Sequence, residues 1–158
     1  MISDDRTPEH IYRSAVSGLY ARIRSNYDYL YNKFGDEGIR MISEMSRQYG
    51  LDVAERAKKS LESNDLESVA GFLLRIFNTV SYGRGWIEPL REGEGRIIIK
   101  AKECPLKFDN PAMCRAHTTM EQTVMNALNP DLDYRIGKSI PAGDEYCEHI
   151  LEIRETKG

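Results

Sequence analysis

The sequence WIEPLREGEGRIIIKAKE, residues 86–103, decides the fold class because the helical pattern of the preceding segments stops there. It contains an isoleucine run at 97–99 and a turn-like REGEG, and its apolar residues show no helical spacing. β-branched residues are enriched in strands, and a glycine-containing turn between two such runs is typical of a hairpin. We therefore predict a β-hairpin over residues 86–103. Because Pro89 has no backbone N–H to donate, its strand is expected at the edge of a sheet.

Helices are predicted for most of the chain before this hairpin. The first has Thr7 as N-cap and Pro8 in its first turn, and apolar residues then recur every three or four positions up to a break at Gly35. The second has Asp36 as its cap and reaches a stop signal around Gly50, after which the composition is again helical. We interpret this second segment as a bent or divided helix.

The third helix has the clearest pattern of the chain. Asn64 or Asp65 caps it, and one face from Leu66 to Val80 is apolar at helical spacing. It is expected to end at the glycine pair Gly83 and Gly85.

A further helix and a second strand pair are predicted after the hairpin. Asn110 and Pro111 begin the helix, and Asn129-Pro130 ends it. The segments 132–140 and 145–155 alternate like paired strands around the turn PAGD. The order of helices, hairpin, helix and hairpin predicts an α+β fold, with N-terminal helices packed on an antiparallel sheet of about four strands.

Composition limits the class of protein. The 158 residues include 41% hydrophobic and 30% charged side chains, which suits a single domain. The net charge is −3 and charges of both signs are interspersed, so we expect no direct nucleic-acid partner. The N-terminus MISDDRTPEH lacks the pattern of a signal peptide, and no apolar stretch has the length of a membrane span. We expect a cytoplasmic protein without a membrane partner, in which three cysteines do not build a disulfide framework.

The segment MCRAHTTMEQ, residues 113–122, groups side chains that can carry chemistry. On a helical wheel His117 lies within an apolar face, and Cys114 and Glu121 lie on its border one turn to either side. In the last strand, alternation places Cys147 and His149 on the face that is expected to point to the core. Two elements therefore each direct a thiol and an imidazole inward.

These groups match the ligand preference of zinc, which is tetrahedral coordination by thiolate and imidazole. We predict a site of three cysteines and one histidine, made of Cys104, Cys114, His117 and Cys147. Glu121 or His149 is an alternative to Cys104 as the fourth ligand.

Two other interpretations of the same residues remain open. Free cysteines and inward histidines are often ordinary buried residues, and Cys-x-x-His is a short pattern with many false positives. A nucleophile is the other alternative: a thiol activated by an imidazole and oriented by an acid. Its candidates are Cys114 or Cys147, His117 or His149, and Glu121 or Asp144.

The stretch GFLLRIFNTVSYGRGWIEPLREGEGRIIIKAKECPL, residues 71–106, resembles the 4-vinyl reductase domain family: a helix ends at Gly-x-Gly, a hairpin follows, and Cys-Pro stands at the strand end. Residues 114–152 resemble still more the related proteins named L-2-amino-thiazoline-4-carboxylic acid hydrolase, through Asn-Pro and then Gly-Asp-x-x-Cys before a closing strand. The likeness covers roughly residues 66–153. It divides the single domain 1–158 into a helical part, 1–63, and a region that resembles the family, 64–155.

The resemblance implies an α+β fold, often dimeric, that encloses a pocket for small apolar or aromatic molecules. Similar domains in phenol-sensing regulators hold a structural zinc with three cysteines and a glutamate, and Cys147 matches the last of these cysteines. Ser139 stands eight residues earlier, where the sensors have another cysteine, so Cys104, Cys114 and His117 would have to complete the site.

We therefore expect a zinc-supported, homodimeric binding domain for a small apolar or heteroaromatic ligand. The alternative is a hydrolase that opens a cyclic C–N bond of a small carboxylated heterocycle such as 2-amino-thiazoline-4-carboxylate, with water activated by zinc at an open coordination position. A third possibility is a dimerising or partner-binding module without chemistry.

Overall fold

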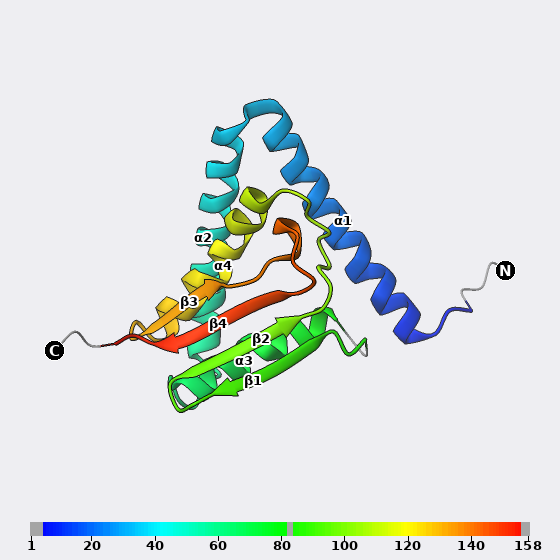
Figure 1. Cartoon of the computed structure of the whole chain (residues 1–158). Helices are drawn as coiled ribbons and strands as arrows, with labels where there is room; N and C mark the ends of the chain where they lie inside the picture. Colours follow the sequence, from blue (N-terminus) through cyan, green and yellow to red (C-terminus); the bar gives the residue numbers. More distant parts are fainter. Residues whose placement is uncertain (1–4, 82–83, 156–158) are drawn as a thin grey trace.

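A computed structural model describes residues 5–81 and 84–155 of the chain (Figure 1). Within these residues it shows four α-helices and one four-stranded antiparallel sheet, which confirms the predicted α+β class. The elements follow in the order α1 (Pro8–Phe34), α2 (Asp36–Lys58), α3 (Leu66–Val80), β1 (Ile87–Glu92), β2 (Arg96–Ala101), α4 (Pro111–Leu128), β3 (Leu132–Ile136), the short 3-10 helix η1 (Ile140–Ala142) and β4 (Cys147–Ile153).

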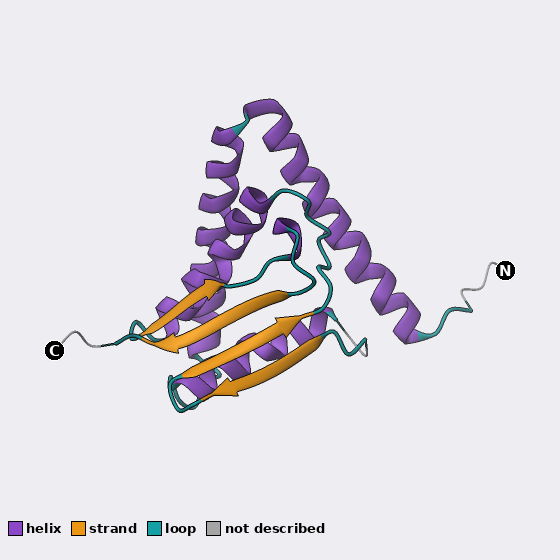
Figure 2. Cartoon of the chain, in the orientation of Figure 1, coloured by secondary structure: helices purple, strands orange, loops and turns teal. Residues whose placement is uncertain are grey.

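The strands lie in the order β1-β2-β4-β3, and each neighbouring pair is antiparallel. β1 is therefore an edge strand, and Pro89 lies on it opposite Ile99, which confirms the expectation from its missing N–H. The two predicted strand pairs join through β2 and β4 into one sheet (Figure 2). The connection from β3 to β4 contains η1 and then Gly143 with a positive φ of 102°, so it is longer than a tight turn.

The helices form layers on one side of the sheet. α3 and α4 cover one sheet face, and α2 packs along α4 (Figure 1). The main core lies between these layers, and its fully buried side chains include Leu73, Ile99, Met125 and Leu151. Because α3, α4 and the sheet all direct side chains inward here, this region positions the candidate site.

A second apolar cluster ties α1 and α2 to the loop after β2. It contains Ile42 of α2, Leu106 and Phe108 of the loop, and Met113 at the start of α4, with side chains of α1 packed against them. The Arg24 guanidinium also donates a hydrogen bond to the Leu106 carbonyl at 3.0 Å. The loop between β2 and α4 is therefore held against the first helix.

α1 is long and largely exposed. It has 27 residues, and none of them is fully buried. That length is enough to cross a membrane. In the described parts of the chain, however, no helix combines this length with the apolar composition that a span requires.

Three of the predicted helix caps are confirmed. The Thr7 hydroxyl accepts a hydrogen bond from the backbone N–H of the third helical residue of α1, and the Asp65 carboxylate accepts one at 2.8 Å in the first turn of α3. The Asn110 side chain does the same for α4 at 2.9 Å. The expected end of α3 was placed too late, because the helix stops at Val80, and Gly83 lies outside the described residues.

The predicted division of α2 is wrong, because the helix is continuous from Asp36 to Lys58. Gly50 is buried against α4: a Cβ atom built on it would lie 2.8 Å from the Met120 carbonyl oxygen and 2.9 Å from the Thr123 Cβ. The glycine therefore allows the two helix backbones to approach closely and does not end the helix. The cap of α2 was also assigned one residue too late, since Gly35 occupies that position.

Candidate functional site: a cavity between the helices and the sheet

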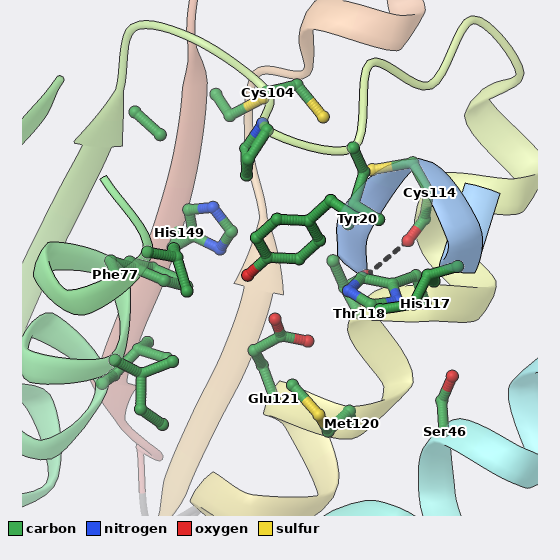
Figure 3. A pocket seen from close by; sticks show the side chains of 18 of the residues that line it. Tyr20, Ser46, Phe77, Cys104, Cys114, His117, Thr118, Met120, Glu121 and His149 are labelled. Atoms are coloured by element: carbon green, nitrogen blue, oxygen red, sulfur yellow. Dashed lines mark hydrogen bonds between the residues drawn. The ribbon is translucent and has the colours of Figure 1, made fainter. Parts of the chain in front are cut away.

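A cavity of about 750 Å³ lies between α1, α2, α3, α4 and the sheet. This volume is within the range of roughly 300–1,000 Å³ that is usual for small-molecule sites. Most of its lining is apolar, and it includes the aromatic side chains Tyr20, Tyr27, Tyr49, Phe72, Phe77, Trp86 and Phe108. Figure 3 shows that residues from several elements face this one space.

The residues singled out from the sequence all line this cavity: Cys104, Cys114, His117, Glu121, Cys147 and His149. Asp144, the alternative acid for a nucleophile, does not line it and instead accepts a hydrogen bond from the Ser139 N–H at 2.8 Å. The sequence pattern thus identified one common site, although it did not fix how the side chains are arranged within it.

The four predicted zinc ligands do not form a coordination shell in this structure. Across residues 5–81 and 84–155, no three His, Cys, Asp or Glu side chains converge in a way that could hold a metal ion. Figure 3 shows Cys104 and Cys114 at one end of the site, well separated from the Glu121 carboxyl at the other. The arrangement therefore gives no support to the zinc site, which stays a prediction.

The three cavity cysteines form no disulfide, and burial favours the protonated thiol at two of them. Burial raises the pKa of Cys114 to about 11, although a hydrogen bond with Ser139 acts in the opposite direction and lowers it. Burial also raises the pKa of Cys147, whose Sγ accepts a hydrogen bond from the Ile140 N–H at 3.3 Å. Because the thiolate is the reactive form, these two positions lack the electropositive setting of a nucleophilic cysteine. No feature of these two thiols therefore favours the hydrolase alternative.

The two cavity histidines are each paired with a tyrosine. Nδ1 of His149 lies 2.7 Å from the Tyr134 hydroxyl, and Nδ1 of His117 lies 3.0 Å from the Tyr27 hydroxyl. Burial lowers the pKa of both imidazoles to about 4, so both are neutral near pH 7. His149 also packs on the Phe77 ring with 4.5 Å between ring centroids. The imidazoles therefore act as buried hydrogen-bonding groups in the cavity wall.

Glu121 is buried more deeply than its border position on the helical wheel indicated. Its side chain is 7% exposed, and its Oε2 atom has no hydrogen-bond partner within the described structure. Burial raises the pKa of Glu121 to about 7, which a hydrogen bond with its own backbone N–H partly opposes. The carboxyl faces the same space as the Tyr20 hydroxyl (Figure 3).

Tyr20 is a site residue that the sequence did not single out, because it lies on the apolar face of the first helix with no motif around it. It lines the cavity, and burial raises its pKa to about 12. Tyr20, Ile23 and Tyr27 lie on the same helix face, since their spacing of three and four residues matches the helical period. That spacing was a usable signal for a shared wall.

The fold and the cavity together define a small α+β domain with a mainly apolar cavity between its helices and its sheet. No protein-family model matches the chain, and no curated protein sequence matches it. Solved structures resemble it at low sequence identity, two of them at 12% and 14%, and at this level the likeness shows the fold alone.

The first similar structure is subunit 3 of a trafficking protein particle complex from Naegleria fowleri, covalently bound to palmitic acid. It is 12% identical, the match covers 87% of this chain and 96% of that chain, and the TM-score is 0.63. The second is the phenol-responsive sensory domain of the transcription activator PoxR with phenol, at 14% identity, 85% and 74% coverage and a TM-score of 0.58. Neither comparison identifies the chain as a 4-vinyl reductase domain.

Proposed function

We propose that this protein is a binding domain for a small apolar or aromatic molecule, which occupies the cavity between α1, α3, α4 and the sheet. The observation that carries the proposal is a cavity of about 750 Å³ with a mainly apolar lining and a few buried polar groups. Such a composition is typical of ligand sites, in which apolar walls supply affinity and a few polar groups supply orientation. Two proteins of similar fold, which were solved with phenol and with palmitic acid, support the same conclusion.

The structure offers a built-in reporter of binding. Trp86 is the only tryptophan of the chain, and it lines the cavity. Titration with the neutral apolar dye N-phenyl-1-naphthylamine should quench its fluorescence as energy is transferred to the bound dye. Saturable binding of one dye per chain is the expected result, and a linear, unsaturable signal would contradict the proposal.

A matched pair of variants on α4 separates the cavity from the general surface. Thr118 lines the cavity and Thr119 does not, although both hydroxyls donate to the Arg115 carbonyl oxygen at 3.2 Å. Thr118→Phe should weaken dye binding about tenfold or more, because the ring fills part of the space. Thr119→Phe should leave the affinity within about threefold of the wild type. Equal effects of both variants would place the dye outside the cavity.

A covalently held acyl chain is a second candidate. Three thiols, those of Cys104, Cys114 and Cys147, line the apolar cavity, and the similar trafficking subunit carries palmitic acid covalently. An acyl thioester donor would transfer its acyl group to the Cys104 sulfur and release its own thiol. Cys104 is the proposed acceptor because burial disfavours the reactive thiolate at Cys114 and at Cys147. Intact mass spectrometry of the purified protein tests this: an acyl-sized mass increase that hydroxylamine removes supports it, and an unmodified mass argues against it.

Zinc remains a separate prediction, with Cys104, Cys114, His117 and Cys147 as ligands. Metal analysis decides it, because a structural site should retain about one equivalent of zinc and protect its thiols. Less than about a tenth of an equivalent, with three freely titratable thiols, would end the zinc prediction.

We also infer a homodimer that covers the exposed apolar side of α1 and α2. Leu19 is 65% exposed and Tyr29 is 59% exposed, although both belong to types that are usually buried. Light scattering should give about twice the 18.1 kDa mass of the chain. Leu19→Asp should reduce the mass to that of one chain, and Ser17→Asp should not, because Ser17 is exposed on another side of the same helix. A wild-type protein of monomer mass would refute the inference.

A further inference from the structure

Two buried polar side chains of the cavity, those of Glu121 and Ser46, each have an atom without a hydrogen-bond partner among the described residues, and Glu121 is the one of the two that can carry a charge. Its side chain is 7% exposed, and Oε2 receives no hydrogen bond from any described residue. Buried polar groups in folded proteins are nearly always paired, and an unpaired charged group costs more than a neutral one. A partner that the chain does not contain would remove this cost.

Several elements around Glu121 contribute titratable or charged groups to the cavity. The titratable or charged groups that line the cavity or act on this carboxyl are Tyr20 and Tyr27 from α1, Tyr49 and Arg56 from α2, Glu103 and Cys104 from the loop after β2, Cys114 and His117 from α4, Tyr134 from β3, and Cys147 and His149 from β4. No lysine or arginine contributes to the raised pKa of Glu121. The Arg56 guanidinium instead lies over the Tyr49 ring, 5.9 Å from its centroid.

The polar neighbours of Glu121 are committed to other partners or remain neutral. His117 and His149 each have a tyrosine hydroxyl at Nδ1, and burial keeps both imidazoles uncharged near pH 7. The pKa of Tyr20 and that of Tyr134 are both raised, so neither gives up its proton near neutrality. Among the described residues, no cationic side chain therefore acts on this carboxyl, which faces aromatic rings and neutral groups.

We propose that the natural ligand of this cavity is a cationic amine or amidine with an apolar body, whose N–H groups bind the Glu121 carboxylate. The inference rests on the proposed binding function and specifies the chemical class of the ligand. Charge-assisted N–H to carboxylate bonds are about twice as strong as neutral ones, and aromatic faces attract cations. The rings of Tyr20 and Phe77 in the same wall suit the apolar body.

The same geometry disfavours anionic ligands. A carboxylate in the cavity would face Glu121, and Arg56, the basic side chain among the described residues of the lining, lies over the Tyr49 ring and does not contribute to the pKa of Glu121. A free fatty acid or a carboxylated heterocycle without a cationic group therefore matches this site less well than an amine of equal size.

Three probes of the same shape test the head-group preference: 4-phenylbutylamine, 4-phenylbutan-1-ol and 4-phenylbutanoic acid. Their dissociation constants are measured by calorimetry and by Trp86 fluorescence. The amine should bind about tenfold or more tightly than the alcohol, and the acid should bind most weakly. Binding of the amine should also strengthen from about pH 6 to about pH 8, as Glu121 loses its proton, while binding of the alcohol stays level.

Glu121→Gln keeps the size of the side chain and removes its charge. In this variant the preference for the amine over the alcohol should fall to within about threefold, with alcohol affinity nearly unchanged. Glu44→Gln on α2 is the matched control, because Glu44 is exposed and does not line the cavity, and it should retain the wild-type preference. If Glu121→Gln does not fold, the pH dependence of binding of the three probes to the wild-type protein still tests whether the cavity prefers a cation.

Failure of this inference is distinguishable from failure of the binding function. Equal affinities for the three probes, a preference for the acid, or an unchanged preference in Glu121→Gln would overturn the cationic ligand class. If N-phenyl-1-naphthylamine binds in the cavity and the amine does not, the binding domain stands and the cationic class is wrong. If neither the dye nor any of the three probes binds, the proposed binding function fails and the inference fails with it.

Discussion

Replacing Glu121 by glutamine should make the free protein more stable, and the gain should grow with pH. Burial raises the pKa of this carboxyl from 4.5 to about 7. A group whose pKa is higher in the folded state holds its proton more tightly there. Folding stability from this group is therefore fully present below the unfolded pKa and is lost as pH rises towards the folded pKa.

The size of the effect follows from the shift. One pKa unit corresponds to about 1.4 kcal/mol, so the wild-type protein should lose about 2–3 kcal/mol relative to Glu121→Gln between about pH 5 and about pH 8. For a domain of this length, that difference moves the melting temperature by roughly 4–12 °C. The measurement is a series of thermal and urea unfolding curves of both proteins across this pH range.

The histidines require that the two proteins be compared at each pH. Burial lowers the pKa of His117 and of His149 to about 4, so their contribution to stability is present above 6.5 and is lost as pH falls towards 4. This pH dependence is opposite in sign to that caused by Glu121. Because the wild type and Glu121→Gln both contain these histidines, it cancels in the difference between their free energies of unfolding. Glu44→Gln on the exposed surface of α2 serves as the control and should change the free energy of unfolding by less than about 0.5 kcal/mol. Parallel pH profiles of the wild type and Glu121→Gln would refute the burial of an unpaired carboxyl.

Other consequences of the packing are measurable by urea unfolding. Gly50→Ala should cost about 1–3 kcal/mol, because its Cβ would lie 2.8 Å from a backbone oxygen of α4. Gly71→Ala on α3 has no atom within 4 Å of the new Cβ and should stabilise by about 0.5–1 kcal/mol. Tyr134→Phe should cost about 1–3 kcal/mol, because it leaves the buried Nδ1 of His149 unpaired. Asp65→Ala removes the N-cap of α3 and should cost about 1 kcal/mol. A neutral Gly50→Ala would contradict the close approach of α2 and α4, and a neutral Tyr134→Phe or Asp65→Ala would contradict the corresponding hydrogen bond.

The fold was predictable where the signals are local. A cap such as Asp65 or Asn110 acts on the first turn of its own helix, and Pro89 excludes itself from a central strand by its own chemistry. Gly50 was misinterpreted as a helix end because the residues that require a glycine there belong to a different helix. The α4 backbone lies too close to Gly50 for a Cβ atom to fit. A sequence shows that a glycine is present, but it does not show which neighbour requires it.

The site was predictable as a group of residues and not as an arrangement. Periodicity on α4 and alternation on β4 directed Cys114, His117, Cys147 and His149 inward, and all of them line the cavity. Whether these groups meet at metal-binding distance depends on the width of the cavity, which is set by packing between several elements. The burial of Glu121 likewise follows from α2 and the sheet covering α4 from two sides, which a single helical wheel does not represent.

The stability that the buried Glu121 carboxylate costs the free protein and the affinity of the cavity for a cation are thermodynamically linked. A cation that binds the ionised carboxylate lowers the folded pKa of Glu121 and so returns stability that the free protein loses as pH rises. Saturating 4-phenylbutylamine should therefore raise the melting temperature of the wild type more at about pH 8 than at about pH 6. In Glu121→Gln the gain should be equal at both values. An alcohol of the same shape should stabilise both proteins equally at either pH, because a neutral head group does not distinguish the two charge states. If the amine and the alcohol gave the same pH profile, the unpaired carboxyl would be a cost of the fold without a role in recognition.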